Sequence, residues 1–259
     1  MGHERTAAIV IKTTDFGESD RIVHFFTREF GRVRGVAKGA KRSLRRFIGS
    51  LEFPAHVDLR FFEKKTSDLV RVETATLKQQ FAGIRGDLEK LSEASLLLEI
   101  VAFATGEHEP HRPLFDALVR GLTLIDGLNE WERKGPGVSR LLETRLLSLL
   151  GFEPGLAACV GCRKPLDDIL HPVFSIARGG VLCDACASGE RNLLPVGRDT
   201  LRLLAQGIRA DIDLLPRFTW SPRTAREAAL LIHPFAQAQL GRELRSLRFM
   251  EALARTVSP

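Results

Sequence analysis

The sequence lacks an apolar run long enough to cross a bilayer, and even the stretch 94–105 is interrupted by Glu99. It begins MGHERTAAIV, without the basic start and apolar run of a secretory signal. It also lacks the Gly-x-x-x-x-Gly-Lys-Ser/Thr loop that holds ATP phosphates. We therefore expect a cytoplasmic protein with reduced thiols, no membrane partner and no such nucleotide-binding loop.

Acidic residues are also missing between Phe30 and Leu51. Residues 1–80 hold 16 Lys and Arg against 10 Asp and Glu, while the rest of the chain holds 22 of each. The whole formal charge of +6 therefore belongs to the first third, which predicts an N-terminal module with an anionic partner. The acid-free stretch contains seven basic residues: Arg32, Arg34, Lys38, Lys41, Arg42, Arg45 and Arg46.

The first 80 residues have the pattern of short strands, rich in β-branched residues and alternating polar with apolar positions. Five strands in about 80 residues are typical of a small closed barrel. Alternation places Phe25 and Phe26 on opposite faces, and likewise Phe61 and Phe62, so one member of each pair belongs to the core. The expected strands are Thr6–Thr14, Arg21–Arg28, Arg32–Lys38, Phe53–Glu63 and Leu69–Leu77.

The basic stretch 32–46 reads RVRGVAKGAKRSLRR, and its Gly-rich part, Gly35–Arg46, is the connection between the third and fourth expected strands. One interpretation is a phosphate-binding surface, because guanidinium and ammonium groups neutralise a nucleic-acid backbone whatever its base sequence. The other is a solvated loop that only keeps the protein soluble. Its place on a small β-barrel favours nucleic-acid binding, since such barrels commonly bind single strands along a basic groove.

After Gln79 the apolar residues recur with a helical period. We interpret Gly135–Pro136–Gly137 as a break between two helices, because glycine and proline interrupt helical patterns. The overall expectation is an α+β protein, with a barrel domain over residues 1–80 and a helical domain over 81–259. The expected helices are Gly86–Thr105, His111–Leu128, Ser139–Leu150, Gly197–Ile208, Arg223–Gln239 and Leu244–Ala254.

All four cysteines form two Cys-x-x-Cys pairs, Cys159 with Cys162 and Cys183 with Cys186, twenty residues apart. This spacing indicates one structural zinc ion per chain, because each tight turn aims two thiolates at a common tetrahedral ion. Two disulfides or a redox dithiol are the alternatives. Four sulfurs fill the shell, so we expect no catalysis at the metal and an ordinary surface or packing role for His171. The zinc module should cover about residues 157–190.

Three acidic residues, Asp15, Glu18 and Asp20, lie together in the turn after the first expected strand. Such a group can hold the metal of a nuclease. No second acidic cluster stands at a suitable spacing, and a role in the turn and in strand capping is the simpler interpretation.

With these features in view, the chain resembles the RecO family of bacterial DNA repair proteins. Three segments carry most of the resemblance: IKTTDFGESDRIVHFFTREFGRVRGVAKGAKRSLRRF (11–47), LLETRLLSLLGFEPGLAACVGC (141–162) and FSIARGGVLCDAC (174–186). The tail 240–253 is similar in type but less specific.

The resemblance implies an N-terminal OB-fold, a helical domain with a zinc module, and a recombination mediator instead of an enzyme. It implies binding of single- and double-stranded DNA, annealing of complementary strands, and loading of RecA together with RecR onto strands coated by single-strand-binding protein. By position, the four cysteines match the family's metal ligands. Lys38, Lys41, Arg42, Arg45 and Arg46 match its basic DNA-binding loop, to which charge and strand position add Arg32 and Arg34.

Family members also bind the acidic tail of single-strand-binding protein on the helical domain. Six arginines among its apolar helical positions are candidates for this contact, although exposed faces of amphipathic helices explain them equally well. Two other functions stay open: an adaptor for which DNA is a secondary ligand, and an RNA-binding OB-fold protein. The six residues are Arg217, Arg223, Arg226, Arg242, Arg245 and Arg248.

Overall fold

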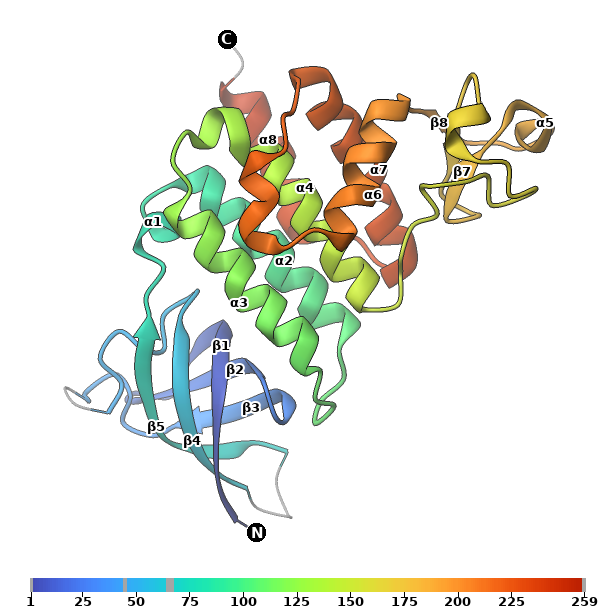
Figure 1. The fold of residues 1–259 in the computed structure, drawn as a ribbon. Coiled ribbons are helices and arrows are strands. Elements are labelled where there is room, and N and C mark those ends of the chain that lie inside the picture. Colours follow the sequence, from blue (N-terminus) through green and yellow to red (C-terminus); the bar gives the residue numbers. More distant parts are fainter. Residues whose placement is uncertain (1, 44–45, 64–67, 258–259) are drawn as a thin grey trace. The chain divides into compact units, whose positions relative to one another are not determined.

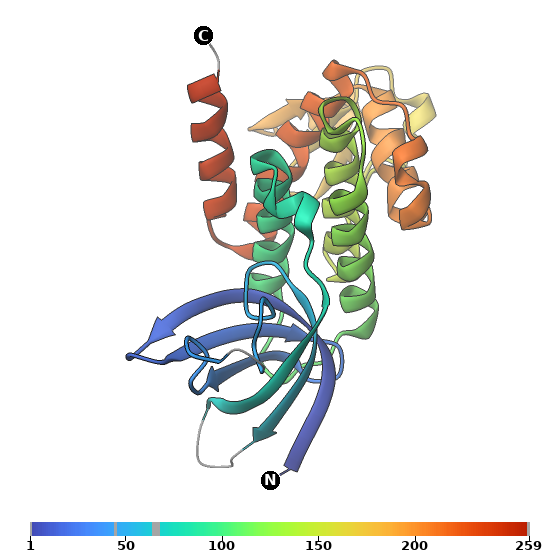
Figure 2. The ribbon, with the colours of Figure 1, turned by 90° about the vertical axis from the view of Figure 1, so that its left-hand side faces the viewer.

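The structure, a computed structural model, describes residues 2–43, 46–63 and 68–257. Five strands close into a barrel in the order β1-β2-β3-β5-β4 (Figure 1, Figure 2). The predicted N-terminal barrel of an α+β protein is thereby confirmed. Its strands are β1 (Gly2–Phe16), β2 (Asp20–Thr27), β3 (Gly31–Ala37), β4 (His56–Glu63) and β5 (Val70–Gln79).

Two strand contacts close the barrel. β1 is longer than predicted because its first residues pair with the end of β4, where Gly2 stands opposite Glu63. β3 and β5 meet in a short parallel contact that pairs Gly35 with Val70. A Cβ on Gly35 would lie 2.6 Å from a methyl of Val72, so only glycine permits this approach. One parallel contact in an otherwise antiparallel five-stranded barrel is the arrangement of an OB-type fold.

Inward and outward side chains alternate along β2 as the sequence predicts. Phe25 is fully buried in the barrel core together with Phe61 of β4. Phe26 points to the outer face and is also buried, because its ring packs 5.8 Å from that of Phe115. The second member of this aromatic pair therefore binds a helix and is unavailable to a ligand.

Three helices complete the first compact unit, which spans residues 1–126. Asp87 caps the second of them by accepting hydrogen bonds from the Glu89 and Lys90 N–H groups at 2.9 and 3.1 Å. Arg28 of the barrel donates from Nε to the Asp116 carboxylate at 2.7 Å. The barrel strands end at Gln79 and the helices begin at Ala82. The division into two domains at residue 80 stays a prediction. The helices are α1 (Ala82–Arg85), α2 (Leu88–Ala104) and α3 (Arg112–Gly127).

The second compact unit, residues 127–259, is mainly helical. α4 packs closely on α6, where a Cβ on Gly207 would lie 2.3 Å from Leu141. No helix among the described residues is both long and apolar enough to span a membrane. The helices are α4 (Trp131–Leu149), α6 (Arg198–Arg209), η2 (Ile212–Arg217), α7 (Pro222–Leu240) and α8 (Arg245–Val257).

The predicted break at Gly135–Pro136–Gly137 is wrong, because α4 runs through these residues from Trp131. A Cβ on Gly135 would lie 2.4 Å from the Trp131 ring, and one on Gly137 would lie 2.3 Å from the Trp220 ring. The glycines therefore serve close packing of two indole rings against the helix. Tertiary packing here outweighs a local propensity that disfavours helix.

A small module interrupts the helices of the second unit. Its strands form a three-stranded sheet in the order β7-β6-β8. The Phe174 ring meets the Phe235 ring of α7 edge to face, with centroids 5.7 Å apart, which attaches the module to the helices. Its elements are η1 (Leu166–Asp168), β6 (Val173–Ser175), β7 (Gly180–Leu182), α5 (Asp184–Ala187) and β8 (Leu193–Pro195).

Candidate metal centre and nucleic-acid interface

The first cysteine pair lies in a tight loop before β6. The Cys159 N–H donates to the Lys164 carbonyl and the Arg163 N–H donates to the Cys159 carbonyl, both at 2.8 Å. A Cβ on Gly161 would lie 2.9 Å from the Cys186 sulfur, so glycine is needed where the two pairs approach. The loop thus presents both thiols on one side.

The second pair lies at the start of α5, directly after β7. Cys183 is the N-cap residue of this short helix, and Cys186 follows within its single turn. The Ala187 N–H donates to the Cys183 carbonyl at 2.9 Å and closes that turn. A strand end and one helical turn therefore aim the second pair toward the first.

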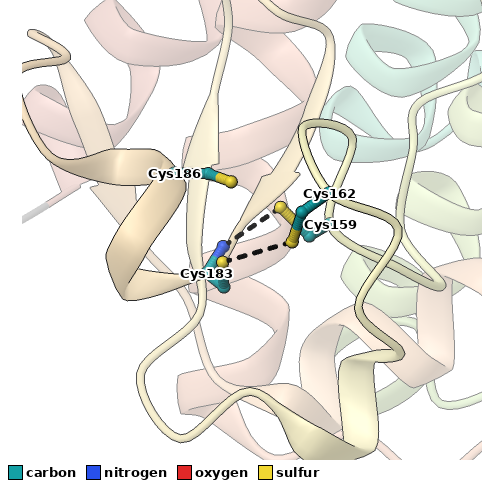
Figure 3. A group of neighbouring side chains, drawn as sticks. All are labelled: Cys159, Cys162, Cys183 and Cys186. Carbon is teal, nitrogen blue, oxygen red and sulfur yellow. Dashed lines mark hydrogen bonds between the residues drawn. The ribbon is translucent and has the colours of Figure 1, made fainter.

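The four cysteines converge on one point (Figure 3). Their sulfur atoms all lie within 4.8 Å of one another, and those of Cys162 and Cys183 are 3.6 Å apart. A tetrahedral ion with metal–sulfur bonds of about 2.3 Å would separate its sulfur ligands by about 3.8 Å. All four thiols are free, so the disulfide interpretation is not supported. The predicted ligand set is brought together, and it fits a single metal ion.

The environment of the cluster helps Cys159 to become a thiolate. Burial raises the pKa of its thiol, but N–H groups of Cys162, Cys183 and Gly161 outweigh this and lower the pKa to about 6. One of these donors, the Cys183 N–H, lies 3.4 Å from the Cys159 sulfur. Hydrogen bonds that the Cys186 thiol donates to Cys159, Cys162 and Cys183 instead raise the pKa of Cys186 to about 12. A cation at the centre would counter the mutual repulsion of four thiolates.

The basic loop after β3 is held against the turn between β1 and β2. The Gly39 N–H donates to the Asp20 carboxylate at 2.8 Å, and the Lys41 N–H donates to the Ser19 carbonyl at 2.9 Å. The hydrogen bond from Gly39 is the main cause that lowers the pKa of Asp20. Among the predicted loop residues, Lys38, Lys41, Arg42 and Arg46 are exposed, and Arg45 lies outside the described residues.

The Lys41 ammonium already binds two acceptors within the protein. It lies 3.0 Å from the Asp15 carboxylate and 3.1 Å from the Gly17 carbonyl oxygen, and its side chain is only 27% exposed. The hydrogen bond from Lys41 is the main cause that lowers the pKa of Asp15. Lys41 therefore fastens the loop to the turn. The acidic turn holds the loop in place, because Asp15 binds Lys41 and Asp20 accepts a hydrogen bond from Gly39.

Arg46 is partly committed as well. Its guanidinium donates to the Lys38 carbonyl at 2.9 Å and lies 5.1 Å from the centroid of the Phe47 ring. This contact joins the two ends of the loop. Lys38 and Arg42 are consequently the described loop cations that are best placed to meet an external anion.

Comparison with known proteins identifies the family. The family model "Recombination protein O N terminal" matches residues 1–81, and "Recombination protein O C terminal" matches residues 85–248. This chain belongs to the RecO family. The match is consistent with the barrel and with the helical part that carries the cysteine module, and the family indicates a role in DNA repair.

Relatives with this name cover nearly the whole chain. The DNA repair protein RecO of Syntrophus aciditrophicus is 34% identical over 253 residues, which are 97% of this chain and 96% of that protein. The protein of the same name from Anaeromyxobacter dehalogenans strain 2CP-1 is 32% identical over 254 residues, 98% of each chain. That of Pelobacter propionicus is 32% identical over 256 residues, also 98% of each chain.

The remaining two predicted DNA-binding residues, Arg32 and Arg34, lie before the loop on β3, where buried Val33 stands between them. Arg34 forms an ion pair with Glu107, with Nε 2.9 Å from Oε1. The strand register also places Lys12 and His24 beside Arg34. The sequence pattern does not indicate Lys12 and His24, because only the register shows that they share this face.

Proposed function

We propose that this RecO family member is a non-catalytic mediator of homologous recombination. It binds single- and double-stranded DNA through the barrel, anneals complementary strands and assists RecA loading together with RecR. The observation that carries this proposal is the basic loop, which Asp20 and Lys41 hold in place while Lys38 and Arg42 remain exposed. Family membership supports the DNA repair context in which such a loop acts.

A fixed loop of exposed cations suits annealing for an electrostatic reason. Lysine and arginine side chains neutralise phosphates without reading bases, so two strands approach with less repulsion and their bases stay free to pair. A loop that is already ordered also loses less conformational entropy when DNA binds. Neither step requires covalent chemistry, which agrees with a role without catalysis.

We propose that the cysteine cluster holds one structural Zn²⁺ ion. Four thiolates are a ligand set that zinc prefers in structural sites, and they leave no open position for water or substrate. Cys159, Cys162, Cys183 and Cys186 would then join the loop before β6 to α5 and stabilise the module. The ion would contribute to folding and would do no chemistry.

The protein partners belong to the same proposal. We assign the acidic tail of single-strand-binding protein to the second unit, where all six candidate arginines are exposed. Some of these arginines also have partners within the protein: Arg223 Nε lies 2.8 Å from the Glu227 carboxylate, and Arg248 Nη1 lies 3.8 Å from that of Glu243. The cytoplasm near the nucleoid is the expected location, because RecR, RecA and chromosomal DNA act there.

The loop assignment is tested by the salt dependence of DNA binding. Lys38→Gln combined with Arg42→Gln should weaken binding to both single strands and duplexes. On single strands, the slope of log affinity against log salt should fall by about 0.7 for each phosphate that the variant no longer neutralises. An unchanged slope would exclude the loop as the phosphate-binding surface.

A matched control removes the same charge elsewhere. Arg133→Gln combined with Lys134→Gln neutralises two cations on α4 that pair with Glu130, and it should leave DNA binding unchanged. An annealing assay on strands coated with single-strand-binding protein then tests the mediator role. The loop variant should anneal slowly and the control variant at the normal rate.

A further inference from the structure

A small cavity lies between the outer face of the barrel and the end of α2. Its volume is about 180 Å³, and all of its lining comes from the first compact unit. Lys12, His24, Arg32 and Arg34 contribute basic side chains, while α2 and the segment after it contribute Phe103 and Glu107. The proposed loop contacts do not use this cavity.

The strand register explains why the basic side chains gather there. Lys12 of β1 stands opposite His24 of β2, and His24 stands opposite Arg34 of β3. Directly opposed residues of neighbouring strands point to the same face, so the three form a row across the sheet. Arg32 lies two residues before Arg34 and therefore faces the same side.

The positive charge of the cavity is only partly balanced. Glu107 pairs with Arg34, and each of these side chains is 37% exposed. The Nε atom of Arg32 is buried, and it has no hydrogen-bond partner among the described residues. The pKa of His24 is lowered, first by burial and then by the charges of Lys12 and Arg34. A buried guanidinium N–H without an acceptor is costly, and an anionic ligand would relieve that cost.

The wall opposite the strands is held in position. The Arg32 N–H donates to the Gly106 carbonyl at 3.4 Å, and the His108 N–H donates to the Arg32 carbonyl at 3.2 Å. Gly31 has a positive φ of 62°, and a Cβ there would lie 2.3 Å from the Glu109 carbonyl oxygen. These backbone contacts fix the segment that carries Glu107 against β3. The cavity therefore exists before a ligand arrives.

Size and lining restrict the ligand. The volume of about 180 Å³ is smaller than the ~300 Å³ of a pocket that encloses a whole drug-sized ligand, so the cavity takes one flat ring while the rest of the ligand stays at its open rim. Phe103 offers an aromatic ring that is 37% exposed. A flat ring beside uncompensated cations suits a base with its phosphate. A duplex cannot insert a base there without breaking a pair, so the cavity favours single strands.

We propose that this cavity is a subsite for one nucleotide of single-stranded DNA. Arg32 and Lys12 bind its phosphate, and the base lies against Phe103. Glu107 competes with the phosphate for Arg34 and so limits the affinity. The subsite rests on the proposed DNA-binding function and adds to it a preference for unpaired strands. β3 leads from Arg34 directly to Lys38, which connects the subsite with the basic loop.

The test compares binding of a thymidine oligonucleotide with binding of a duplex of equal length. Phe103→Leu should weaken oligonucleotide binding about five- to tenfold, since stacking of one base on an aromatic ring contributes about that much or more. Arg32→Gln should weaken it by about as much, because the phosphate loses a charged donor. Duplex binding should change less than about twofold. Equal losses for both DNA forms would overturn the subsite, because they would indicate a general charge effect.

Glu107→Gln provides a readout that misfolding cannot imitate. Because this variant frees Arg34, oligonucleotide affinity should rise severalfold and the salt slope should steepen by about 0.7. Unchanged or weaker binding would overturn the role of Glu107 and, with it, the subsite. If Arg32→Gln instead abolished binding of an acidic peptide and left DNA binding intact, the cavity would be a peptide site and the proposal would be wrong.

The loop variant separates this proposal from the function on which it rests. If Lys38→Gln with Arg42→Gln weakens DNA binding while Arg32→Gln does not, only the subsite is refuted. If neither variant changes DNA binding, both the subsite and the proposed function are refuted. Far-ultraviolet circular dichroism of each variant checks that the barrel is folded.

Discussion

Asp20 and Gly39 are joined by a hydrogen bond in which the Gly39 N–H donates to the Asp20 carboxylate at 2.8 Å. Asp20 begins β2, and Gly39 follows β3, so one contact ties the basic loop to the turn on the neighbouring strand. Gly39 has a positive φ of 67°, a conformation that glycine adopts without strain. The acid thus orders the loop cations without neutralising them through a direct salt bridge.

Replacement of Asp20 separates loop order from net charge. Asp20→Ala removes one negative charge, so electrostatics alone predicts tighter DNA binding. We expect weaker binding, about three- to tenfold at moderate salt, because the loop loses its anchor and must be ordered on binding. Fluorescence anisotropy with a labelled oligonucleotide measures this. Tighter binding would show that Asp20 does not order the loop.

Substitutions of the neighbouring residues Lys41 and Arg42 should change the salt dependence of DNA binding differently. Lys41→Gln should destabilise the turn and lower affinity while leaving the salt slope nearly unchanged, since its ammonium already binds Asp15 and the Gly17 carbonyl. Arg42→Gln should reduce the slope by about 0.7 on single strands. Titrations over a series of salt concentrations compare the two, and equal slope changes would contradict the assigned role of Lys41.

The cysteine cluster should bind one zinc ion per chain. Elemental analysis of protein purified without chelator should give one equivalent, and a value below about half an equivalent would contradict a closed four-thiolate site. Cys162→Ser should lose the metal and lower the melting temperature of the second unit more than that of the barrel. His171→Ala, an exposed residue of the same module, should keep both metal and stability.

A buried ion pair in the second unit predicts a dependence of stability on pH. Glu143 is fully buried and forms an ion pair with Arg140, whose side chain is 4% exposed, and the His233 Nε2 atom lies 3.4 Å from its carboxylate. Burial raises the pKa of Glu143, but Arg140 and His233 outweigh it and lower the pKa below the usual carboxyl value. Its contribution to stability is therefore complete above the unfolded pKa of about 4.3 and is lost as pH falls through the lowered pKa.

Glu143→Gln tests this contribution. It leaves the Arg140 guanidinium buried without its anion and should cost about 3–5 kcal/mol of unfolding free energy at pH 7. Urea unfolding from about pH 7 to about pH 3.5 should show the difference from the natural protein shrinking below about pH 4. Glu130→Gln, in an exposed pair with Arg133, should leave the unfolding free energy nearly unchanged. A small, pH-independent cost for Glu143→Gln would contradict the assignment.

Features encoded by short spacing could be predicted from the sequence. Two Cys-x-x-Cys turns carry their own geometry, so the spacing alone indicates the four ligands, and the fold then brings them together. Strand alternation likewise placed Phe25 and Phe26 on opposite faces, and the run of basic residues located the loop between β3 and β4. Each of these patterns reflects contacts within a few residues of chain.

What depends on distant segments was decided by the tertiary structure alone. The row formed by Lys12, His24 and Arg34 depends on the register of three strands, and the binding of Lys41 to Asp15 depends on a turn packed against a loop. The close packing of Gly137 against the Trp220 ring also joins distant segments, and no local propensity describes it. The sequence by itself therefore determined the two cysteine pairs, the barrel and the charge of the loop. Packing between distant segments decided which cations are bound internally and which remain exposed.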